Sequence, residues 1–296
     1  MKLSGCLAII AALSAAAARP AAAQEDAIRL QPSSDWSLEY ADQHCALRRS
    51  FGEEVQRTFL EIRLSYPNTS FRVSVVSERF PVGALEPVTH FEPDTGETQA
   101  HLPVALLQGT NRIGGLYGDS LHLSAMRSDD ALKDDQGQII WSDAARDARE
   151  REITAYNVSD LFFDDLTLQT GEMHAPMNAL RDCVNDLLRT LGVDPTAQAT
   201  LSREPEPVNF VRMFRNVQQA GANPTRAAAI SVHVRLVIDP SGEVAGCYLH
   251  DIAADPERHE ALCAAYRRSE FEPALDASGT AVTAVWGTVM SWVAVR

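Results

Sequence analysis

The sequence predicts an α+β protein, with an N-terminal mixed β-rich domain that ends in a helix and a small ββαβ domain after it. Apolar residues alternate with period two in the first half of the chain, and three- and four-residue spacing marks one long helical face later. A short charged, proline-containing segment precedes the last third. We therefore expect domains at 24–202 and 209–296, a linker at 203–208 and an export signal at 1–23.

The first residues have the features of a cleaved signal peptide. Lys2 precedes an apolar run of about 13 residues, which fits a signal core and is shorter than the ~20 residues that span a bilayer. Small residues at 21–23 offer a cleavage site, and Cys6 precedes the apolar core, unlike a lipoprotein cysteine. The alternative is an uncleaved membrane anchor, which the interruption of the run by Arg19 and Pro20 opposes.

The composition is that of a globular protein with an acidic surface. The chain has 296 residues, 45% hydrophobic and 22% charged, with a formal net charge of −14. Without the signal, 24 basic residues stand against 40 acidic ones. Such a surface repels phosphates and anionic lipid headgroups, so we exclude nucleic-acid binding. No later segment predicts a membrane span. Lysine occurs only at positions 2 and 133, and this preference for arginine indicates a GC-rich bacterial genome and a periplasmic destination.

Three strands with one buried face are expected early in the N-terminal domain, at 36–40, 60–64 and 71–75. The region 81–137 is rich in Pro, Gly, Asp and Thr, which predicts loops with short strands. Within it, "GTNRIGGLYGDS" lacks the spacing of a phosphate-binding loop and is interpreted as a turn-rich loop. The charged run "SDAARDARE" predicts an exposed helix.

One long helix closes the N-terminal domain. Its apolar residues recur at three- and four-residue spacing on a single face, with Cys183 beside it. These residues are Met177, Leu180, Val184, Leu187, Leu188 and Leu191. Gly192 occupies the position of a C-terminal cap, and Pro195 follows just beyond.

The C-terminal domain is predicted as a β-hairpin, a helix and a final strand. "SVHVRLVID" places its apolar residues on one face, "DPSG" is a turn, and "EVAGCYLHDI" is the returning strand. "ADPERHEALCAAYRR" is a helix with Asp255 as N-cap and Pro256 at its first position. After the connector "EFEPALDASG", the segment 280–295 is a long strand, on which Trp286 and Trp292 share a face that we assign to the core.

The C-terminal segment resembles the TonB C-terminal domain family over 209–296. The resemblance rests on the D-x-x-G turn at Asp239 and Gly242, on "FEPA" from Phe271, and on "DASG" from Asp276, in that order. Asn223-Pro224 stands where energy transducers carry Tyr-Pro, and their long proline-rich spacer is missing. The region 24–202 resembles an uncharacterised region of alphaproteobacterial envelope proteins, which implies no activity.

Four cysteines remain in the exported chain, and an even count in an oxidising compartment favours two disulfides over free thiols. Three pairings exist, of which the simplest joins Cys247 to Cys263 and Cys45 to Cys183. The family resemblance adds support for the first pair.

The cluster of two cysteines and two histidines near the C-terminus allows other chemistry. Zinc would need Cys247, His250, His259 and Cys263 to converge, but 247 and 250 lie on opposite faces of a strand. A catalytic Cys–His pair would need a reduced thiolate, which the periplasm opposes. We therefore favour the disulfide and expect no metal, cofactor or catalytic residue.

Other candidate chemistry is sparse. The pairs Asp129-Asp130 and Asp164-Asp165 are interpreted as solvated surface, and His44 stands beside Cys45, which the disulfide pairing occupies.

We interpret the protein as a periplasmic interaction module. The resemblance implies that the final strand lies at a sheet edge and adds an extended peptide from an envelope or outer-membrane protein. The expected edge residues are Thr283, Val285, Val289, Ser291 and Val293. The first alternative is a periplasmic hydrolase with a site around His90, His101 and His122, and the second is a purely structural envelope protein. The sequence does not indicate an oligomeric state.

Overall fold

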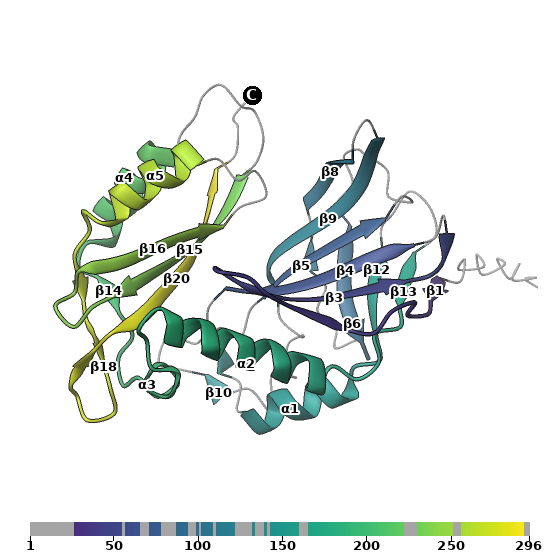
Figure 1. Cartoon of the computed structure of the whole chain (residues 1–296), viewed down its shortest axis with the longest axis horizontal. Coiled ribbons are helices and arrows are strands. Elements are labelled where there is room, and N and C mark those ends of the chain that lie inside the picture. The colour runs from purple at the N-terminus through teal and green to yellow at the C-terminus, as the bar shows by residue number, and fades with distance from the viewer. Residues whose placement is uncertain are drawn as a thin grey trace, which may run out of the picture.

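The protein has an α+β fold, as predicted. A computed structural model describes residues 27–54, 57–65, 71–77, 87–93, 99–100, 102–108, 111–121, 132–133, 139–140, 143–159, 165–221, 230–250 and 256–292. Two sheets dominate, and we call them the large sheet, of six strands, and the small sheet, of three strands. In Figure 1 they lie on opposite sides of the molecule, with α2 running along the lower side of both.

The large sheet is antiparallel throughout, in the order β2-β3-β4-β5-β9-β8. Its strands are β2 (Ser37–Tyr40), β3 (Cys45–Phe51), β4 (Thr58–Leu64), β5 (Phe71–Ser77), β9 (Asn111–Leu121) and β8 (Leu102–Gln108). The three strands predicted from alternation are β2, β4 and β5. Leu60 and Ile62 of β4 and Val73 and Val75 of β5 are buried on one face.

A second, five-stranded sheet packs against the same core in the order β1-β13-β12-β6-β7. Its strands are β1 (Ile28–Leu30), β13 (Leu166–Leu168), β12 (Ala155–Ser159), β6 (Val88–Glu92) and β7 (Gln99–Ala100). Phe91 of β6 contacts the rings of Phe71 and Tyr156, which joins the two sheets through one aromatic cluster. Two short strands, β10 (Leu132–Lys133) and β11 (Ile139–Ile140), form a separate pair.

Helix α2 (His174–Thr190) is the predicted long helix, and its apolar face is buried. It ends where Gly192 adopts a φ of +75°, and Pro195 then begins α3 (Pro195–Ala199). Asp194 caps α3 by accepting a hydrogen bond from the Thr196 N–H at 2.9 Å. The C-terminal end of α2 and the whole of α3 lie next to the small sheet (Figure 1).

One local prediction for the N-terminal region is wrong, and a second is correct for the helix but not for the exposure of all its residues. The segment interpreted as a turn-rich loop is β9, an eleven-residue strand in which Gly114, Gly115 and Gly118 pair with β5. Glycine weakens a strand on its own, but here the neighbours β5 and β8 supply both hydrogen-bond ladders. The predicted exposed helix is α1 (Asp143–Glu152), in which Arg149 and Glu150 are buried.

The small sheet is antiparallel, with β15 (Ile230–Ile238) between β16 (Val244–His250) and β20 (Ala284–Trp292). Helices α4 (Phe210–Gly221) and α5 (Pro256–Tyr266) lie together on one side of it (Figure 1). The β-hairpin, helix and final strand therefore follow the predicted order, and α4 is an addition. Trp286 packs on the rings of Tyr266 and Phe271, as expected of a core residue.

The segment expected to be a linker is tied to the C-terminal part. Its short strand β14 (Glu206–Pro207) pairs with β17 (Phe271–Glu272), and Arg203 bridges to Leu275. Nearby, β18 (Ala274–Leu275) and β19 (Ala281–Val282) form a hairpin. Among the described residues, no helix has the length and apolarity that a membrane crossing needs.

Two disulfides connect these elements. Cys45 of β3 bonds to Cys183 of α2, and Cys247 of β16 bonds to Cys263 of α5. These are the two pairs that the sequence favoured. The first fixes α2 to the large sheet, and the second fixes α5 to the small sheet.

The Cys247→Ala/Cys263→Ala variant should lose about 3 kcal/mol of unfolding free energy. A bridge that closes a loop of about 15 residues stabilises by about this amount, because it lowers the entropy of the unfolded chain. Denaturant unfolding under oxidising conditions measures the loss. The Cys45→Ala/Cys183→Ala variant is the comparison, and its loss should be larger, about 5 kcal/mol, since its cysteines are separated by 138 residues. Equal stability of the first variant and the parent protein would contradict this account.

The hairpin turn between β15 and β16 requires glycine at position 242. Gly242 has a φ of +86°, and a Cβ there would lie 2.0 Å from the carbonyl oxygen of Phe271. Gly279 is a matched control, because its φ is +81° and nothing lies within 4 Å of its Cβ position.

We expect Gly279→Ala to lower the free energy of unfolding by about 1–2 kcal/mol, which is the cost of placing a residue with a Cβ in the left-handed backbone conformation. Gly242→Ala should cost clearly more, since Phe271 must also move and the β14–β17 pairing with it. Thermal unfolding of the two variants compares these costs, and an equal loss would show that the close approach to Phe271 is unimportant.

Candidate functional site

Among the described strands, β20 is an edge of the small sheet, because it has β15 as its one neighbour in the strand order. The register pairs Val285 with Val237 and Val289 with His233. An edge strand presents backbone N–H and C=O groups that a further strand can pair with. This edge is therefore the first candidate for binding.

Gln198 of α3 shows which backbone groups of β20 point outward. The Val285 N–H donates to Oε1 of Gln198 at 2.7 Å, and the Val285 carbonyl accepts from Nε2 at 3.4 Å. Both groups therefore point away from β15. Because backbone direction repeats every second residue, the groups of Gly287, Val289 and Ser291 also point outward.

The side chain of Gln198 thus covers only the start of this edge. Within the described residues, no hydrogen bond joins the backbone of Gly287 or Val289 to an element beyond β15. The stretch from Gly287 to Ser291 is long enough for two or three rungs of an added strand.

The structure places the five predicted edge residues unevenly. Val285 is only 5% exposed and packs with Leu188, Val193 and Val237, so its side chain is core. Thr283 directly precedes β20, and Val289 and Ser291 lie within it. Val293 lies outside the described residues.

A second candidate is a cluster of basic side chains where the small sheet meets the large one. We call it the junction cluster, and it consists of His44, Arg63, Arg72, His233, Arg235 and His250. His233 and Arg235 lie on the face of β15 opposite its buried valines, and His250 pairs with His233 from β16. The other three come from the start of β3 and from the paired strands β4 and β5.

Contacts across the junction link these groups directly. Arg72 Nε lies 3.2 Å from Nε2 of His233, and Arg63 Nη1 contacts Nε2 of His250. The rings of His44 and His250 are 5.0 Å apart between centroids. Carboxylates accompany the cluster on the side of the large sheet, where Glu61 pairs with Arg63 at 2.6 Å.

Arg235 is the most deeply buried member. Only 2% of the residue is exposed, and its Nη1 donates to the backbone carbonyls of Gln43, at 3.0 Å, and Ser65. Its guanidinium lies over the ring of Tyr248, 4.8 Å from the centroid. Burial lowers the pKa of Arg235 to about 10, so the side chain stays charged at neutral pH.

Two histidines of the junction, His44 and His250, are held neutral. Burial, followed by the charge of Arg63, lowers the pKa of His44 to about 4. Burial, followed by the charges of Arg72 and Arg63, lowers the pKa of His250 to about 2. A proton on either ring would face guanidinium groups at close range.

Sequence reasoning did not find this cluster. His44 and His250 were considered only as partners for cysteines, and both cysteines are in disulfides. A signal was present in "SVHVRLV", where the face opposite the valines carries histidine and arginine. Its meaning depends on which surface covers that face, and the local pattern does not contain that information.

One group of side chains has metal-ligand chemistry but is already satisfied. Asp147, Glu150 and His174 place ligand atoms within 4.8 Å of one another. Both oxygens of the buried Glu150 accept hydrogen bonds from Arg181, at 2.5 and 2.9 Å. His174 Nδ1 lies 3.3 Å from Oε2 of the same carboxylate. A cation there would have to displace Arg181, so we assign the group to the contact between α1 and α2.

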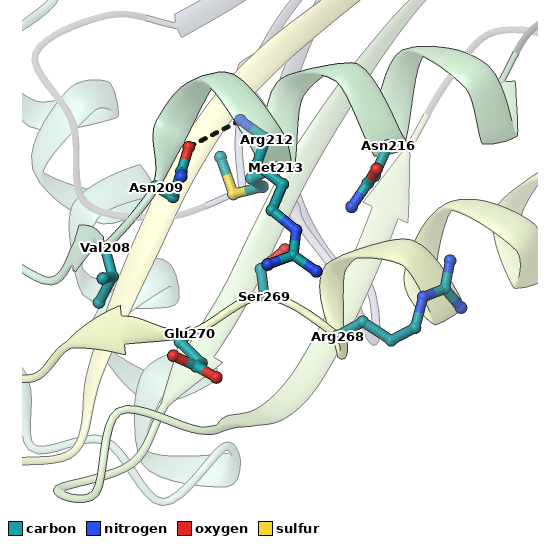
Figure 2. Close-up of a pocket in the computed structure, with 8 residues that line it drawn as sticks. All are labelled: Val208, Asn209, Arg212, Met213, Asn216, Arg268, Ser269 and Glu270. Atoms are coloured by element: carbon teal, nitrogen blue, oxygen red, sulfur yellow. Dashed lines mark hydrogen bonds between the residues drawn. The ribbon is translucent and has the colours of Figure 1, made fainter.

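A shallow surface pocket lies between the start of α4 and the segment after α5. Figure 2 shows its lining, in which Asn209 accepts from the Arg212 backbone N–H at 2.9 Å. The side chain of Arg268 extends away from that of Arg212, so the two guanidinium groups do not converge (Figure 2). Phe210 and Phe214 stack beside it and are 55% and 42% exposed.

Of the three histidines considered for a hydrolase site, His101 and His122 lie outside the described residues. Asp129, Asp130 and Asp164 of the two acidic pairs also lie outside them. His90 lies on β6 and its Nε2 is 2.9 Å from the amide of Asn157. Asn157 also donates to Glu92 at 3.1 Å, which belongs to an ion pair with Arg29. These contacts form a polar cross-strand network.

Comparison with protein families, with curated proteins and with solved structures finds no match to this chain.

The junction should make the protein sensitive to mild acid. An unfolded histidine titrates near 6.5, whereas His44 and His250 resist protonation in the native state, so the unfolded chain binds more protons below that pH. Native stability should therefore be complete above pH 6.5 and fall as the pH drops toward 4, by up to about 1.4 kcal/mol per pH unit for each histidine.

Urea unfolding at pH 7, 6 and 5, in chloride without multivalent anions, measures this slope. The His44→Gln variant should lose about half of it, because one of the two resistant imidazoles is gone. The three measured pH values lie above the ordinary pKa of surface carboxylates, which is about 4. Parallel stability curves for the variant and the parent would disprove the assignment.

Proposed function

We propose that this protein is a periplasmic protein-interaction module that binds an extended peptide by adding it as a strand to β20. The proposal includes two domains, of which the second, at 209–296, is TonB C-terminal-like. It also includes a peptide partner from an envelope or outer-membrane protein. The two disulfides fit an oxidising environment outside the cytoplasm.

The observation that carries the proposal is the contact between Gln198 and Val285. A primary amide has the same donor and acceptor as a peptide group, and here it satisfies both outward groups of one β20 residue. An incoming strand would continue this pairing from Gly287 onward, with main-chain hydrogen bonds as the source of affinity.

Substitution of Val289 tests the mechanism. Val289→Pro removes the outward N–H, while the ladder to β15 uses the alternate residues, so the sheet should tolerate it at an edge. Val289→Thr is the matched control, because threonine keeps the branched shape and the N–H. We expect the parent and the threonine variant to retain the same partner from an envelope extract, and the proline variant to lose at least about tenfold in affinity.

Hydrogen exchange gives a second readout on the same material. The amides of Gly287 and Val289 should exchange rapidly in the free protein and become protected when the recovered peptide binds. Thermal unfolding checks that the proline variant is folded. Undiminished binding by that variant, or protection located elsewhere, would rule out strand addition at β20.

A further inference from the structure

The junction cluster holds a buried guanidinium, that of Arg235, for which the described residues supply no carboxylate, in a protein that is acidic overall. Arg63, Arg72 and Arg235 lie within it, and Arg48 borders it. The carboxylates among the described residues at this place are Glu61 and Glu39, which pair with Arg48 at 2.6 and 2.7 Å. Arg48 and Arg63 share these two carboxylates, whereas no ion pair joins the buried Arg235 to a carboxylate of the described residues, and its neighbour Tyr248 is uncharged at neutral pH.

Donors in the cluster lack acceptors. Arg235 is 2% exposed, and within the described part of the chain its Nε and Nη2 groups have no hydrogen-bond partner, although Nη1 has two. The Nε group of Arg63 is likewise buried without a partner. Buried polar groups in native proteins are nearly always paired, because an unmade bond costs the desolvation of the group. Several unpaired N–H donors of charged side chains thus indicate a missing acceptor.

The chain brings these donors to one place. Arg235 bonds to the carbonyls of Ser65 and Gln43, which lie two residues from Arg63 and directly beside His44. The side chains of Arg63 and His44 each remain 14% exposed, so the cluster reaches solvent along one side.

The sign of the charge decides what the ligand is. Three imidazoles close together would suit a transition metal on their own. Here Arg63 contacts His250 and Arg72 contacts His233, both at the Nε2 atom that would bind a metal. Guanidinium groups repel a cation and present forks of donors that match the oxygens of a carboxylate or a phosphate.

We propose that the junction cluster is a binding site for an oxyanion, a carboxylate or a phosphate group, held by Arg63 and Arg235 between the large and the small sheet. Such a ligand supplies acceptors to the unpaired donors and balances the charge of Arg235. It also joins strands from both sheets, so its binding strengthens the contact between them. The site is separate from the β20 edge, so anion binding there can be measured in the absence of a peptide.

Isothermal titration of the purified chain tests this site, with inorganic phosphate in one arm and citrate in another. Both titrations are run at pH 7.5 with sodium chloride adjusted to constant ionic strength. We expect saturable binding of at least one of the two anions and a raised melting temperature at saturation. Binding of phosphate alone identifies a phosphate group as the ligand chemistry, and binding of citrate alone identifies a carboxylate.

Arg63→Gln is the main variant, because Arg63 is partly exposed and Glu61 keeps Arg48 as a partner. Its affinity for the anion should fall about tenfold or more, as loss of a charge-assisted hydrogen bond predicts. Arg189→Gln is the matched control, since Arg189 lies on the exposed side of α2 and pairs only with Asp186 among the described residues. Its affinity should equal that of the parent.

Two results would overturn the proposal. The first is the absence of saturable binding of both anions to the folded parent protein. The second is equal anion affinity in the Arg63→Gln and Arg189→Gln variants, with both shown by near-ultraviolet circular dichroism to be folded.

Discussion

The position of Arg235 on β15 determines how the two halves of the molecule meet. β15 is the central strand of the small sheet, and it is buried on both faces. Val232, Val234 and Leu236 face the helices, whereas Arg235 faces the large sheet and bonds to the carbonyls of Gln43 and Ser65. These carbonyls belong to the end of the β3–β4 pair, where the ladder has no further residues to satisfy them.

The same end of the large sheet is fixed covalently. Cys45 begins β3 and is bonded to Cys183 of α2, and the last turns of α2 deliver Leu188 to the small sheet. Val237 and Val285 pack on Leu188 there. The contact between the sheets therefore has an apolar part at α2 and a charged part at Arg235, and the disulfide joins α2 to β3, which begins next to the charged part.

The sequence predicted those elements whose burial repeats along a single segment. Leu60 and Ile62 alternate with polar residues, and the apolar residues of α2 recur at helical spacing. Each pattern lies within one segment and reflects the one buried face of that element, so it can be recognised without knowing the rest of the fold. This kind of prediction failed for β9, whose glycines acquire a strand conformation only from the ladders of β5 and β8. The charged helix α1 was predicted correctly as a helix, but the burial of Glu150 was not, because Glu150 becomes buried only when Arg181 of α2 approaches it.

The candidate sites divide along the same line. The sequence at 280–295 predicts a long final strand, and it also predicts which residues of that strand share a face. That Gln198 covers Val285 cannot, because the two are 87 residues apart and nothing local relates them. The junction cluster was hidden for the same reason, since its members come from both sheets and each looks ordinary within its own strand.

The two sites share one strand. His233 of β15 is paired with His250 of β16 on one side and with Val289 of β20 on the other, so one rung of the small sheet crosses both. A ligand between Arg63 and Arg235 would hold this rung against the large sheet. Because β15 cannot shift without moving the β20 ladder, such a ligand would also fix the orientation of the β20 edge. A peptide added to that edge would in turn stabilise the junction, since coupling between two sites is reciprocal.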